Sequence, residues 1–423
     1  MTVRLLSPSH LLGRAQAPPS KSYTHRALVV GSLTGRRFQV VNPLDSDDTR
    51  ATARALRRLG SSFSRSAKSW IVGPTRPRGT TRRIDIQCGE SGTTLRFASV
   101  VAALGDRATR FHGSGRLPER PMGPLLRALE VLGASVDSTG AGAMFTLRGP
   151  IRSGRVRLDA SESSQFASAL LLALPTLPGD SEIRLVGTIV SEPYLQATVS
   201  VLRALGVRVR CGNRSFHVPG SQSYRGRRFA VPGDASSAAY LWVAGALAGG
   251  SVTVRGVDPR WPQADRAILA LLARAGAAVR ETGSTATVGP GGLRPFSADL
   301  TASPDLYPLA GVLAAAIPGT SHLSGAPHIV HKESDRRAET ARLARAFGAR
   351  VRRTRTGLSI EGRSRLRPVE LPDLTDHRLV MSAAVGALAA TGSSRIGEAE
   401  AVRKSFPRFW ETLVALGAEC RAT

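Results

Sequence analysis

A pattern repeated about every seventy residues is the feature that most restricts how this chain can fold. Six leucine-rich segments each end on a glycine, and successive glycines lie 69 to 73 residues apart: Gly60, Gly133, Gly206, Gly276, Gly348 and Gly417. Glycine is the residue expected just beyond the C-terminus of a helix, where the backbone takes a left-handed conformation. Short stretches of alternating polar and apolar residues follow five of the glycines and predict hairpins.

Polar turns that lead into apolar helices form a second series, in register with the first. Corresponding positions of these turns are 71 residues apart: Lys21, Gly92, Ser163, Asp234, Asp305 and Asp376. Strand-like segments precede most of the turns, and Ser, Thr, Asp and Gly are favoured at the N-caps of helices. We therefore predict an α/β fold made of six β-α-β-α-β-β units.

The length of the chain indicates how these six units are grouped. A chain of 423 residues exceeds the usual size of a single hydrophobic core. Six units divide into two domains of three, for which we predict residues 19–227 and 228–423. A closed threefold arrangement of the units in each domain is the arrangement we expect.

The strongly basic composition raises the question of a polyanionic partner. Lys and Arg together number 58 against 31 Asp and Glu, which gives a net charge of +27. The arginines are spread along the whole chain, whereas a nucleic-acid-binding protein usually gathers them on one face with interleaved aromatics. We therefore expect no specific nucleic-acid partner, although a basic nucleic-acid-binding or nucleic-acid-processing protein remains one alternative.

Several other classes of protein are disfavoured by the sequence. The three cysteines, Cys88, Cys211 and Cys420, are far apart and have no metal-ligand spacing, so neither a disulfide framework nor a metal site is predicted. The longest apolar runs are too short to span a bilayer. The chain passes from Met1 directly into a strand-like segment without a signal-like region. We expect a monomeric, cytoplasmic protein that has no membrane partner.

The helix starts are the candidate binding site. A helix N-terminus carries unpaired N–H groups and a partial positive charge, so several of them on one side of a domain favour an anion. The turns add cations and neutral hydrogen-bonding groups beyond what capping needs: Lys21, Arg26, Arg96, Arg120, Ser163, Ser164, Gln165, Lys332, Arg336, Arg378 and Lys404. Only four lysines occur, and Lys21, Lys332 and Lys404 all lie in these turns. The pattern predicts a protein that handles phosphate or carboxylate groups.

Each of these residues also has a purely structural interpretation. Ser163 and Ser164, like the paired acids Asp47 and Asp48, fit helix N-caps. Glu333 and Arg336 have the i,i+3 spacing of a helical ion pair. The same capping role fits Asp234, for which we favour it, and also Asp305 and Asp376.

The motifs in order resemble the enolpyruvyl transferases, and in particular the 5-enolpyruvylshikimate-3-phosphate synthase family. The similarity covers the whole chain and rests on PPSKSYTHRAL, LDSDDTR, GESGTTLR, RLPERPMG, SSQFASALLLALP, GDASSAAY, SPDLYPLA, HKESDR, DHRLVMSAA and KSFPRFWE. The resemblance implies two inside-out α/β domains of three units each. It also implies that the N-terminal segment, residues 1–18, crosses back and joins the two domains.

The resemblance further implies an activity that needs neither a metal nor an organic cofactor. The enolpyruvyl group of phosphoenolpyruvate is transferred to the 5-hydroxyl of shikimate 3-phosphate, and phosphate is released. The residues implied for shikimate 3-phosphate are Lys21, Ser22, Arg26, Ser163, Ser164, Ser191, Asp305 and Lys332.

A second set of residues is implied for phosphoenolpyruvate, and three residues are implied for catalysis. Phosphoenolpyruvate is expected to contact Lys21, Gly92, Arg120, Gln165, Arg336, Arg378 and Lys404. Asp305 is the expected base on the hydroxyl and Glu333 the expected proton donor to C3 of the enol. Lys21 is the next candidate for the base.

The sequence departs from the family pattern at three positions, and one enzyme alternative remains. Glu90 and Phe97 stand where the family commonly has Asn and Pro, beside the expected phosphoenolpyruvate pocket, and His328 replaces a residue near the shikimate ring. The changes at Glu90 and Phe97 bear on glyphosate sensitivity, and the change at His328 bears on a contact with the shikimate ring. The alternative is UDP-N-acetylglucosamine enolpyruvyl transferase, which has the same fold but would carry SKNA and a loop cysteine that this sequence lacks.

Overall fold

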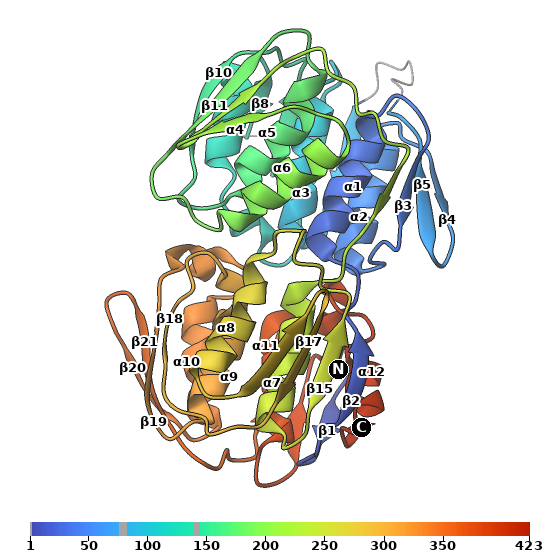
Figure 1. Cartoon of the computed structure of the whole chain (residues 1–423). Helices are drawn as coiled ribbons and strands as arrows, with labels where there is room; N and C mark the ends of the chain where they lie inside the picture. The colour runs from blue at the N-terminus through green and yellow to red at the C-terminus, as the bar shows by residue number, and fades with distance from the viewer. Residues whose placement is uncertain (1, 76–82, 139–143) are drawn as a thin grey trace. The chain divides into compact units, whose positions relative to one another are not determined.

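The computed structural model describes residues 2–75, 83–138 and 144–423, which form two compact units (Figure 1). The N-terminal unit is Pro19–Pro232, and the C-terminal unit consists of Met1–Pro18 and Gly233–Thr423. The boundary therefore follows Pro232, a few residues after the position expected from the sequence. The segment Met1–Pro18 belongs wholly to the C-terminal unit.

Three four-stranded sheets make up the strand layer of the N-terminal unit. In spatial order they are β14 (Arg228–Ala230), β3 (Phe38–Val41), β5 (Ser69–Val72) and β4 (Phe63–Arg65); β6 (Ile84–Gln87), β7 (Thr109–His112), β9 (Phe145–Arg148) and β8 (Ser135–Asp137); and β10 (Arg155–Asp159), β11 (Ser181–Val186), β13 (Ser215–Val218) and β12 (Arg210–Gly212). The turn of the predicted hairpin between β8 and β9 lies outside the described residues.

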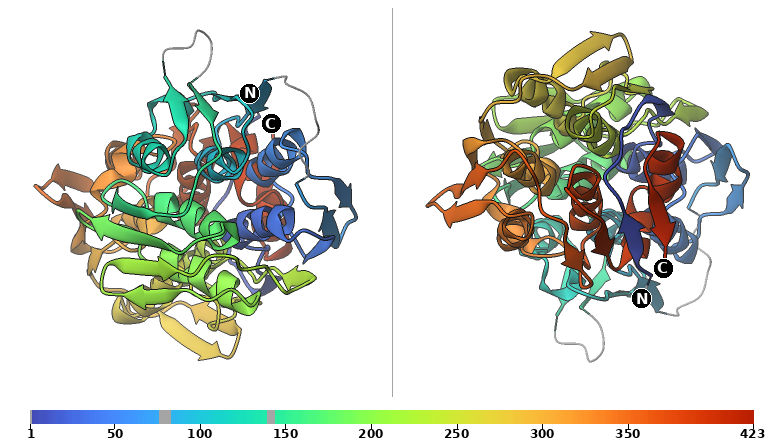
Figure 2. Two further views of the ribbon diagram at one scale, coloured as in Figure 1. Left: turned by 90° about the horizontal axis from the view of Figure 1, so that it is seen from above. Right: turned by 90° about the horizontal axis from the view of Figure 1, so that it is seen from below.

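The C-terminal unit repeats this arrangement. Its sheets are β2 (Gly13–Gln16), β15 (Val252–Arg255), β17 (Thr285–Gly289) and β16 (Ala278–Thr282); β18 (Ser297–Asp299), β19 (Gly319–Ser324), β21 (Gly357–Gly362) and β20 (Arg350–Arg353); and β22 (Glu370–Leu371), β23 (Ser394–Ile396), β1 (Arg4–Leu6) and β24 (Cys420–Ala422). The hairpins β4–β5 and β20–β21 extend outward from the helices of their own units (Figure 2).

Six helices of the N-terminal unit connect its strands. They are α1 (Lys21–Leu33), α2 (Asp47–Arg58), α3 (Gly92–Ala103), α4 (Gly123–Val131), α5 (Gln165–Ala173) and α6 (Pro193–Ala204), with 3-10 helices η1 (Leu117–Glu119) and η2 (Leu174–Thr176). The first helices of the three repeats, α1, α3 and α5, contact one another and are the most buried. The sheets lie outside them, as Figure 1 shows for β3 and β5 beside α1 and α2.

The C-terminal unit has the matching set of helices. They are α7 (Ala235–Leu247), α8 (Ala267–Arg274), α9 (Tyr307–Ala315), α10 (Arg336–Ala346), α11 (His377–Leu388) and α12 (Phe409–Ala415), with η3 (Ala264–Arg266), η4 (Pro304–Leu306), η5 (Pro327–His331) and η6 (Ala399–Lys404). All of α11 is buried, and so is α7 from Ala235 to Ala246. Helices that are apolar on every side belong in a core, and α7, α9 and α11 contact one another there.

The strand pairing confirms the predicted α/β class with six repeated units. In each sheet two neighbouring strands run parallel and the remaining pairs run antiparallel, as a β-α-β crossover followed by a hairpin requires. Two strands are exchanged between repeats: β14, which precedes α7, pairs with β3, and β2, which precedes α1, pairs with β15. A third strand, β1, lies between β23 and β24 and completes the last sheet.

The glycines that end the helices have the backbone conformation predicted for them. All six members of the series have positive φ, from 79° at Gly206 to 116° at Gly60. A residue with a Cβ is strained there, which explains why the repeat keeps glycine at this point. The sequence pattern therefore predicted the second helix end of each repeat correctly.

We predict that Gly276→Ala destabilises the C-terminal unit. The φ of Gly276 is +94°, and an added Cβ would lie 2.3 Å from the carbonyl oxygen of Gly292. Left-handed strain alone costs about 1–2 kcal/mol, so the denaturation midpoint should fall clearly. Gly105→Ala is the matched control, because its Cβ would meet nothing closer than the Ala102 carbonyl oxygen at 3.8 Å. Equal midpoints for both variants in urea unfolding would contradict the prediction.

Candidate functional site

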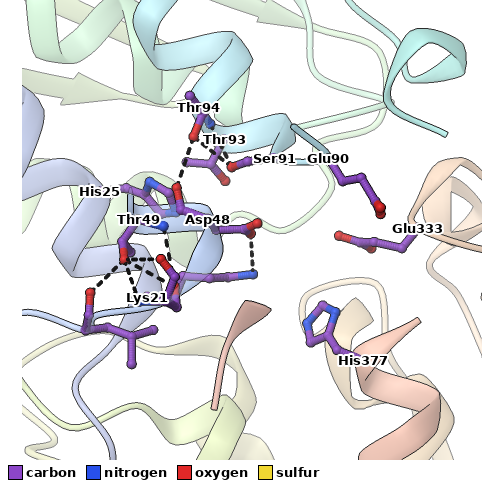
Figure 3. A network of polar contacts seen from close by, with 12 residues as sticks. Lys21, His25, Asp48, Thr49, Glu90, Ser91, Thr93, Thr94, Glu333 and His377 are labelled. Atoms are coloured by element: carbon purple, nitrogen blue, oxygen red, sulfur yellow. Dashed lines mark hydrogen bonds and ion pairs between the residues drawn. The ribbon is translucent and has the colours of Figure 1, made fainter. Parts of the chain in front are cut away.

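Lys21 begins α1 and forms an ion pair with Asp48 of α2. Its Nζ lies 3.1 Å from Asp48 Oδ2, and both side chains are largely buried (Figure 3). Asp48 does not cap α2, because Ser46 does so in a reciprocal capping box with Thr49. The N-cap interpretation of Asp47 and Asp48 is therefore wrong, and Asp48 instead positions the ammonium of Lys21. The pairing of Asp48 with Lys21 was not predicted from the sequence.

A chain of buried hydroxyl groups connects the first three helices of the N-terminal unit. His25 Nδ1 lies 2.7 Å from Thr52 Oγ1, which lies 2.7 Å from Thr94 Oγ1. Thr94 also contacts Ser91, the N-cap of α3. Burial, together with the charges of Lys21 and Arg26, holds the pKa of His25 well below its usual range. His25 is therefore a neutral structural link at neutral pH.

Arg26 is buried and joins α1 to the third repeat. It donates to Thr198 Oγ1 at 2.8 Å, to the carbonyls of Ser22 and Tyr194 at 2.9 Å each, and to Ser168 Oγ at 3.3 Å. These contacts use four of its five N–H donors, and burial lowers its pKa to about 10. A substrate anion at Arg26 would use the remaining N–H or replace one of these partners.

Gly92 and Arg120 lie against each other at the start of α3. A Cβ at Gly92 would lie 3.0 Å from Cζ of Arg120, so the glycine leaves room for the guanidinium group beside the helix N-terminus. Arg120 ends η1 and is 8% exposed, and its Nη1 lies 3.5 Å from the Glu90 carbonyl oxygen. The structure thus places a cation next to the unpaired N–H groups of α3, as the sequence pattern predicted.

Gln165 connects the second and third repeats at their helix starts. Its Oε1 accepts a hydrogen bond from Arg96 Nη1 at 2.8 Å, and its Nε2 donates to Thr93 Oγ1 at 3.1 Å. Ser163 Oγ accepts from the Gln165 backbone N–H at 3.2 Å, whereas Ser164 occupies the N-cap position without a side-chain cap. The capping interpretation therefore fits Ser163 and fails for Ser164.

Ser191 and Ser22 complete the predicted set in this unit. Ser191 has a φ of +55° just before α6 and is 6% exposed, and Ser22 lies in the first turn of α1. The structure therefore brings every predicted residue of the N-terminal unit to the start of α1, α3, α5 or α6.

The polar centre of the C-terminal unit is the buried guanidinium of Arg336. Its side chain is 2% exposed and bonds three carboxylates, at 2.6 Å to Asp305 Oδ1, 2.8 Å to Glu333 Oε2 and 2.8 Å to Asp376 Oδ2. Burial lowers the pKa of Arg336, but Asp376, Glu333 and Asp305 together raise it above its usual value. The i,i+3 pair between Glu333 and Arg336 is therefore present, but as one part of a buried network.

Arg378 shares Asp305 with Arg336. Its Nη2 lies 2.9 Å from Asp305 Oδ2, and its side chain is 4% exposed. Burial lowers the pKa of Arg378, but the Asp305 charge is the main reason for a net shift well above the usual value. Asp305 does not cap a helix, because the N-cap of α9 is Leu306. The structural interpretation of Asp305 as a cap is therefore wrong.

The other two aspartates in the series of turns do cap helices. Asp234 accepts from the Ser237 N–H at 2.8 Å at the start of α7, which confirms the role favoured for it. Asp376 accepts from the Arg378 N–H at 2.9 Å at the start of α11 and also binds Arg336. Asp376 is thus both a cap and part of the site.

The remaining predicted residues of this unit lie at the ends of 3-10 helices. Lys332 follows η5, which contains the nearly buried His328, and Lys404 ends η6. In the described ranges, Cys88, Cys211 and Cys420 are unbonded thiols, and no group of three or more His, Cys, Asp and Glu side chains is arranged to hold a metal ion. No helix among those residues is long and apolar enough to cross a membrane.

The repeated fold and the helix starts together define an α/β protein of two threefold units whose buried cations and carboxylates suit anionic ligands. A model of the EPSP synthase family, 3-phosphoshikimate 1-carboxyvinyltransferase, matches residues 6–413. Halobacterium salinarum 3-phosphoshikimate 1-carboxyvinyltransferase is 41% identical over 98% of both chains, and the Methanocella arvoryzae protein of that name is 40% identical over 98% of both. The chain belongs to the EPSP synthase family.

Solved structures show the same fold. An EPSP synthase from Acinetobacter baumannii superimposes with a TM-score of 0.82, covers 100% of both chains and is 23% identical in sequence. A second structure of EPSP synthase from that organism gives a TM-score of 0.81. The six-unit α/β architecture is therefore that of the family.

We predict that the buried His25 makes the protein less stable as the pH falls. Its folded-state pKa lies well below the value of about 6.5 of an exposed histidine. The unfolded chain therefore binds a proton below pH 6.5 that the folded chain does not. The free energy of unfolding should fall by up to about 1.4 kcal/mol per pH unit from this group.

Urea unfolding of His25→Gln between pH 7.5 and 5 checks this prediction. The variant should lose stability less steeply with falling pH than the natural protein. His10→Gln is the control, since His10 is exposed and should leave the slope unchanged. An unchanged slope in His25→Gln would contradict the predicted role.

Proposed function

We propose that this chain transfers the enolpyruvyl group of phosphoenolpyruvate to the 5-hydroxyl of shikimate 3-phosphate and releases phosphate. The observation that carries this proposal is the match to the EPSP synthase family over residues 6–413. The buried Arg336, which holds Asp305 and Glu333 together, supports it. Such a site offers cations for anionic substrates and carboxylates for proton transfer. The reaction belongs to the shikimate pathway of aromatic amino-acid biosynthesis.

Shikimate 3-phosphate is bound by hydroxyl groups and cations at several helix starts. In the N-terminal unit we assign Lys21, Ser22, Arg26, Ser163, Ser164 and Ser191 to this substrate, and in the C-terminal unit Asp305 and Lys332. Hydroxyl groups beside the unpaired N–H groups of a helix suit a phosphate. This supports the assignment of the serines.

Phosphoenolpyruvate is bound by a second, more cationic set. We assign Lys21, Gly92, Arg120 and Gln165 in the N-terminal unit, and Arg336, Arg378 and Lys404 in the C-terminal unit. The burial of Arg336 and Arg378 supports this assignment, because a guanidinium shielded from water binds a carboxylate or phosphate strongly.

Asp305 and Glu333 divide the proton transfers between them. Asp305 accepts the proton of the 5-hydroxyl group of shikimate 3-phosphate while the oxygen of that hydroxyl group bonds to C2 of phosphoenolpyruvate. Glu333 donates a proton to C3 in the same step. In the second half the bond from C2 to the phosphate oxygen breaks, C3 loses a proton, and phosphate leaves. Lys21, held by Asp48, is the alternative base.

The ion pairs around Arg336 bear on the protonation states proposed for Asp305 and Glu333. Asp305 bonds two guanidinium groups, which favours the ionised form that a base needs. Glu333 bonds Arg336. An anion bound at Arg336 offsets the charge of the guanidinium group, which favours the protonated form of Glu333 that a proton donor needs.

The alternatives from the sequence analysis are not favoured. UDP-N-acetylglucosamine enolpyruvyl transferase and a basic nucleic-acid-binding protein both fit less well than the family that the chain matches. We further propose that the protein is a cytoplasmic monomer that works without a metal or cofactor and has no specific nucleic-acid partner. The net charge of +27 then acts as a non-specific electrostatic field for anions.

We expect the purified protein to release phosphate only when both substrates are present. Phosphate release with phosphoenolpyruvate and shikimate 3-phosphate, followed together with formation of the enol ether, measures this activity. UDP-N-acetylglucosamine in place of shikimate 3-phosphate is the control for the alternative enzyme. Turnover of phosphoenolpyruvate with UDP-N-acetylglucosamine but not with shikimate 3-phosphate would replace the proposed function by that alternative.

We predict that Asp305→Asn lowers kcat much more than it changes the KM of either substrate. The change keeps the size of the side chain but removes a base, and general base catalysis contributes roughly 10²- to 10⁴-fold. Asp258→Asn is the matched control, because Asp258 pairs with the exposed Arg260 in the same unit. Steady-state kinetics on both variants give the answer. A near-normal kcat in Asp305→Asn would leave Asp305 as a substrate anchor and move the base to Lys21.

A further inference from the structure

Asp265 is a buried acid for which the sequence analysis found no role. It lies in η3, between β15 and α8, and is 1% exposed. Neither of its carboxylate oxygens has a hydrogen-bond partner of good geometry in the part of the chain that the structure describes, and the Ser236 hydroxyl comes nearest to that role. It does not cap the following helix, because the N-cap of α8 is Arg266. A buried carboxylate without partners is costly unless it carries a proton.

The surroundings of Asp265 are the polar centre of the C-terminal unit. The charges that act on it are those of Asp305 in η4, Arg378 in α11 and Asp234 at the start of α7. Arg378 turns its Nη2 toward Asp305, while its Nε and Nη1 are buried and make no hydrogen bond of good geometry in the described ranges. The hydroxyl of Tyr240 in α7 also faces Arg378. Asp265 and Asp305 are thus two acids that share one cation.

The backbone around Asp265 is fixed by buried hydrogen bonds. Ser303 Oγ donates to the carbonyl of Ala264 at 3.0 Å, which connects η3 to the turn that holds Asp305. Gln263 donates to the Gly233 carbonyl at 2.7 Å and accepts from the Ala235 N–H at 2.9 Å, which connects η3 to the start of α7. These hydrogen bonds fix the backbone just before Asp265, whose side chain is buried beside the site.

The charge count of this centre explains why one acid should be neutral. Among the ion pairs and charges given above, those of Asp234, Asp265, Asp305, Glu333 and Asp376 act around the buried guanidinium groups of Arg336 and Arg378. Burial, followed by the Asp305 charge, raises the pKa of Asp265 to about 7, although Arg378 opposes this shift. Asp265 is the member without a strong hydrogen bond, so the proton is most stable there.

We propose that Asp265 is a positioning residue that acts through Arg378. As a neutral acid, Asp265 leaves the Arg378 guanidinium group to Asp305 and the anionic substrate. As an ionised carboxylate, Asp265 competes with them for that guanidinium group. The proposal rests on the proposed function, since the anion is taken to be phosphoenolpyruvate. Ionisation of Asp265 offsets the charge of Arg378 and therefore weakens the binding of phosphoenolpyruvate. The KM of this substrate should rise above about pH 7, while kcat changes much less.

Steady-state kinetics of the natural protein and Asp265→Asn between pH 6 and 9 test the proposal. The amide keeps the shape of the neutral acid but does not ionise. At pH 8.5 the KM for phosphoenolpyruvate should be lower in Asp265→Asn than in the natural protein, on the order of tenfold for a charge at this depth. At pH 6 the two values should agree. Titration of the substrate's own phosphate affects both proteins alike and cancels in the comparison.

Two further variants separate a positioning role from a structural one. Asp265→Glu keeps a titratable group and should retain a rise of KM with pH. Asp258→Asn changes a half-buried acid of the same unit, which pairs with the exposed Arg260, and should follow the natural protein at every pH. Identical profiles of KM against pH in Asp265→Asn and the natural protein would overturn the proposal.

A spectroscopic measurement covers the case in which Asp265→Asn fails to fold. Infrared difference spectra of the natural protein should show a protonated buried carboxyl group whose band disappears as the pH is raised through about 7. Absence of any such band would overturn the proposal. This measurement needs no turnover, so it stays informative if the proposed activity is absent, and that absence would be seen separately in the phosphate assay.

Discussion

The Arg336 guanidinium fixes the arrangement on which the C-terminal unit depends. It joins Asp305, Glu333 and Asp376, which precede or lie between different helices, and so brings the starts of α9, α10 and α11 together. Removing one member of such a buried network leaves an uncompensated charge and is strongly destabilising. The groups proposed for catalysis are therefore the same groups that hold this unit together.

In the N-terminal unit, mainly neutral groups join the helices to one another. Arg26 is satisfied by hydroxyl and carbonyl oxygens, and the hydroxyl chain from His25 through Thr52 to Thr94 joins three helices without a buried carboxylate. Among the helix starts of this unit that are described above, a close ion pair joins Lys21 to Asp48. Arg26 is thus positioned by neutral acceptors and Lys21 by Asp48, whereas carboxylates hold both Arg336 and Arg378 in the C-terminal unit. This difference fits a division in which the acid and base come from the C-terminal unit.

The exchange of strands relates the repeat to the division of the chain. Strand β2 precedes α1 of the N-terminal unit but pairs with β15 in the C-terminal unit. Strand β14 precedes α7 of the C-terminal unit but pairs with β3 in the N-terminal unit. A repeat that is continuous in sequence is therefore not always continuous in space. This explains why a boundary placed at Arg227 on the sequence pattern precedes β14, which belongs to the N-terminal unit.

The sequence by itself determined the six repeats, the α/β class, the glycines that end helices and the positions of the cations at helix starts. These features follow from short-range rules, namely periodicity, capping and the backbone freedom of glycine. Only the tertiary structure decided that Asp305 binds Arg336 and Arg378, that Asp48 holds Lys21 and that Asp265 is buried beside them. These partners lie 27 to 73 residues apart. Their contact depends on how whole helices pack, because an aspartate that caps a helix and one that binds a distant arginine have the same local sequence.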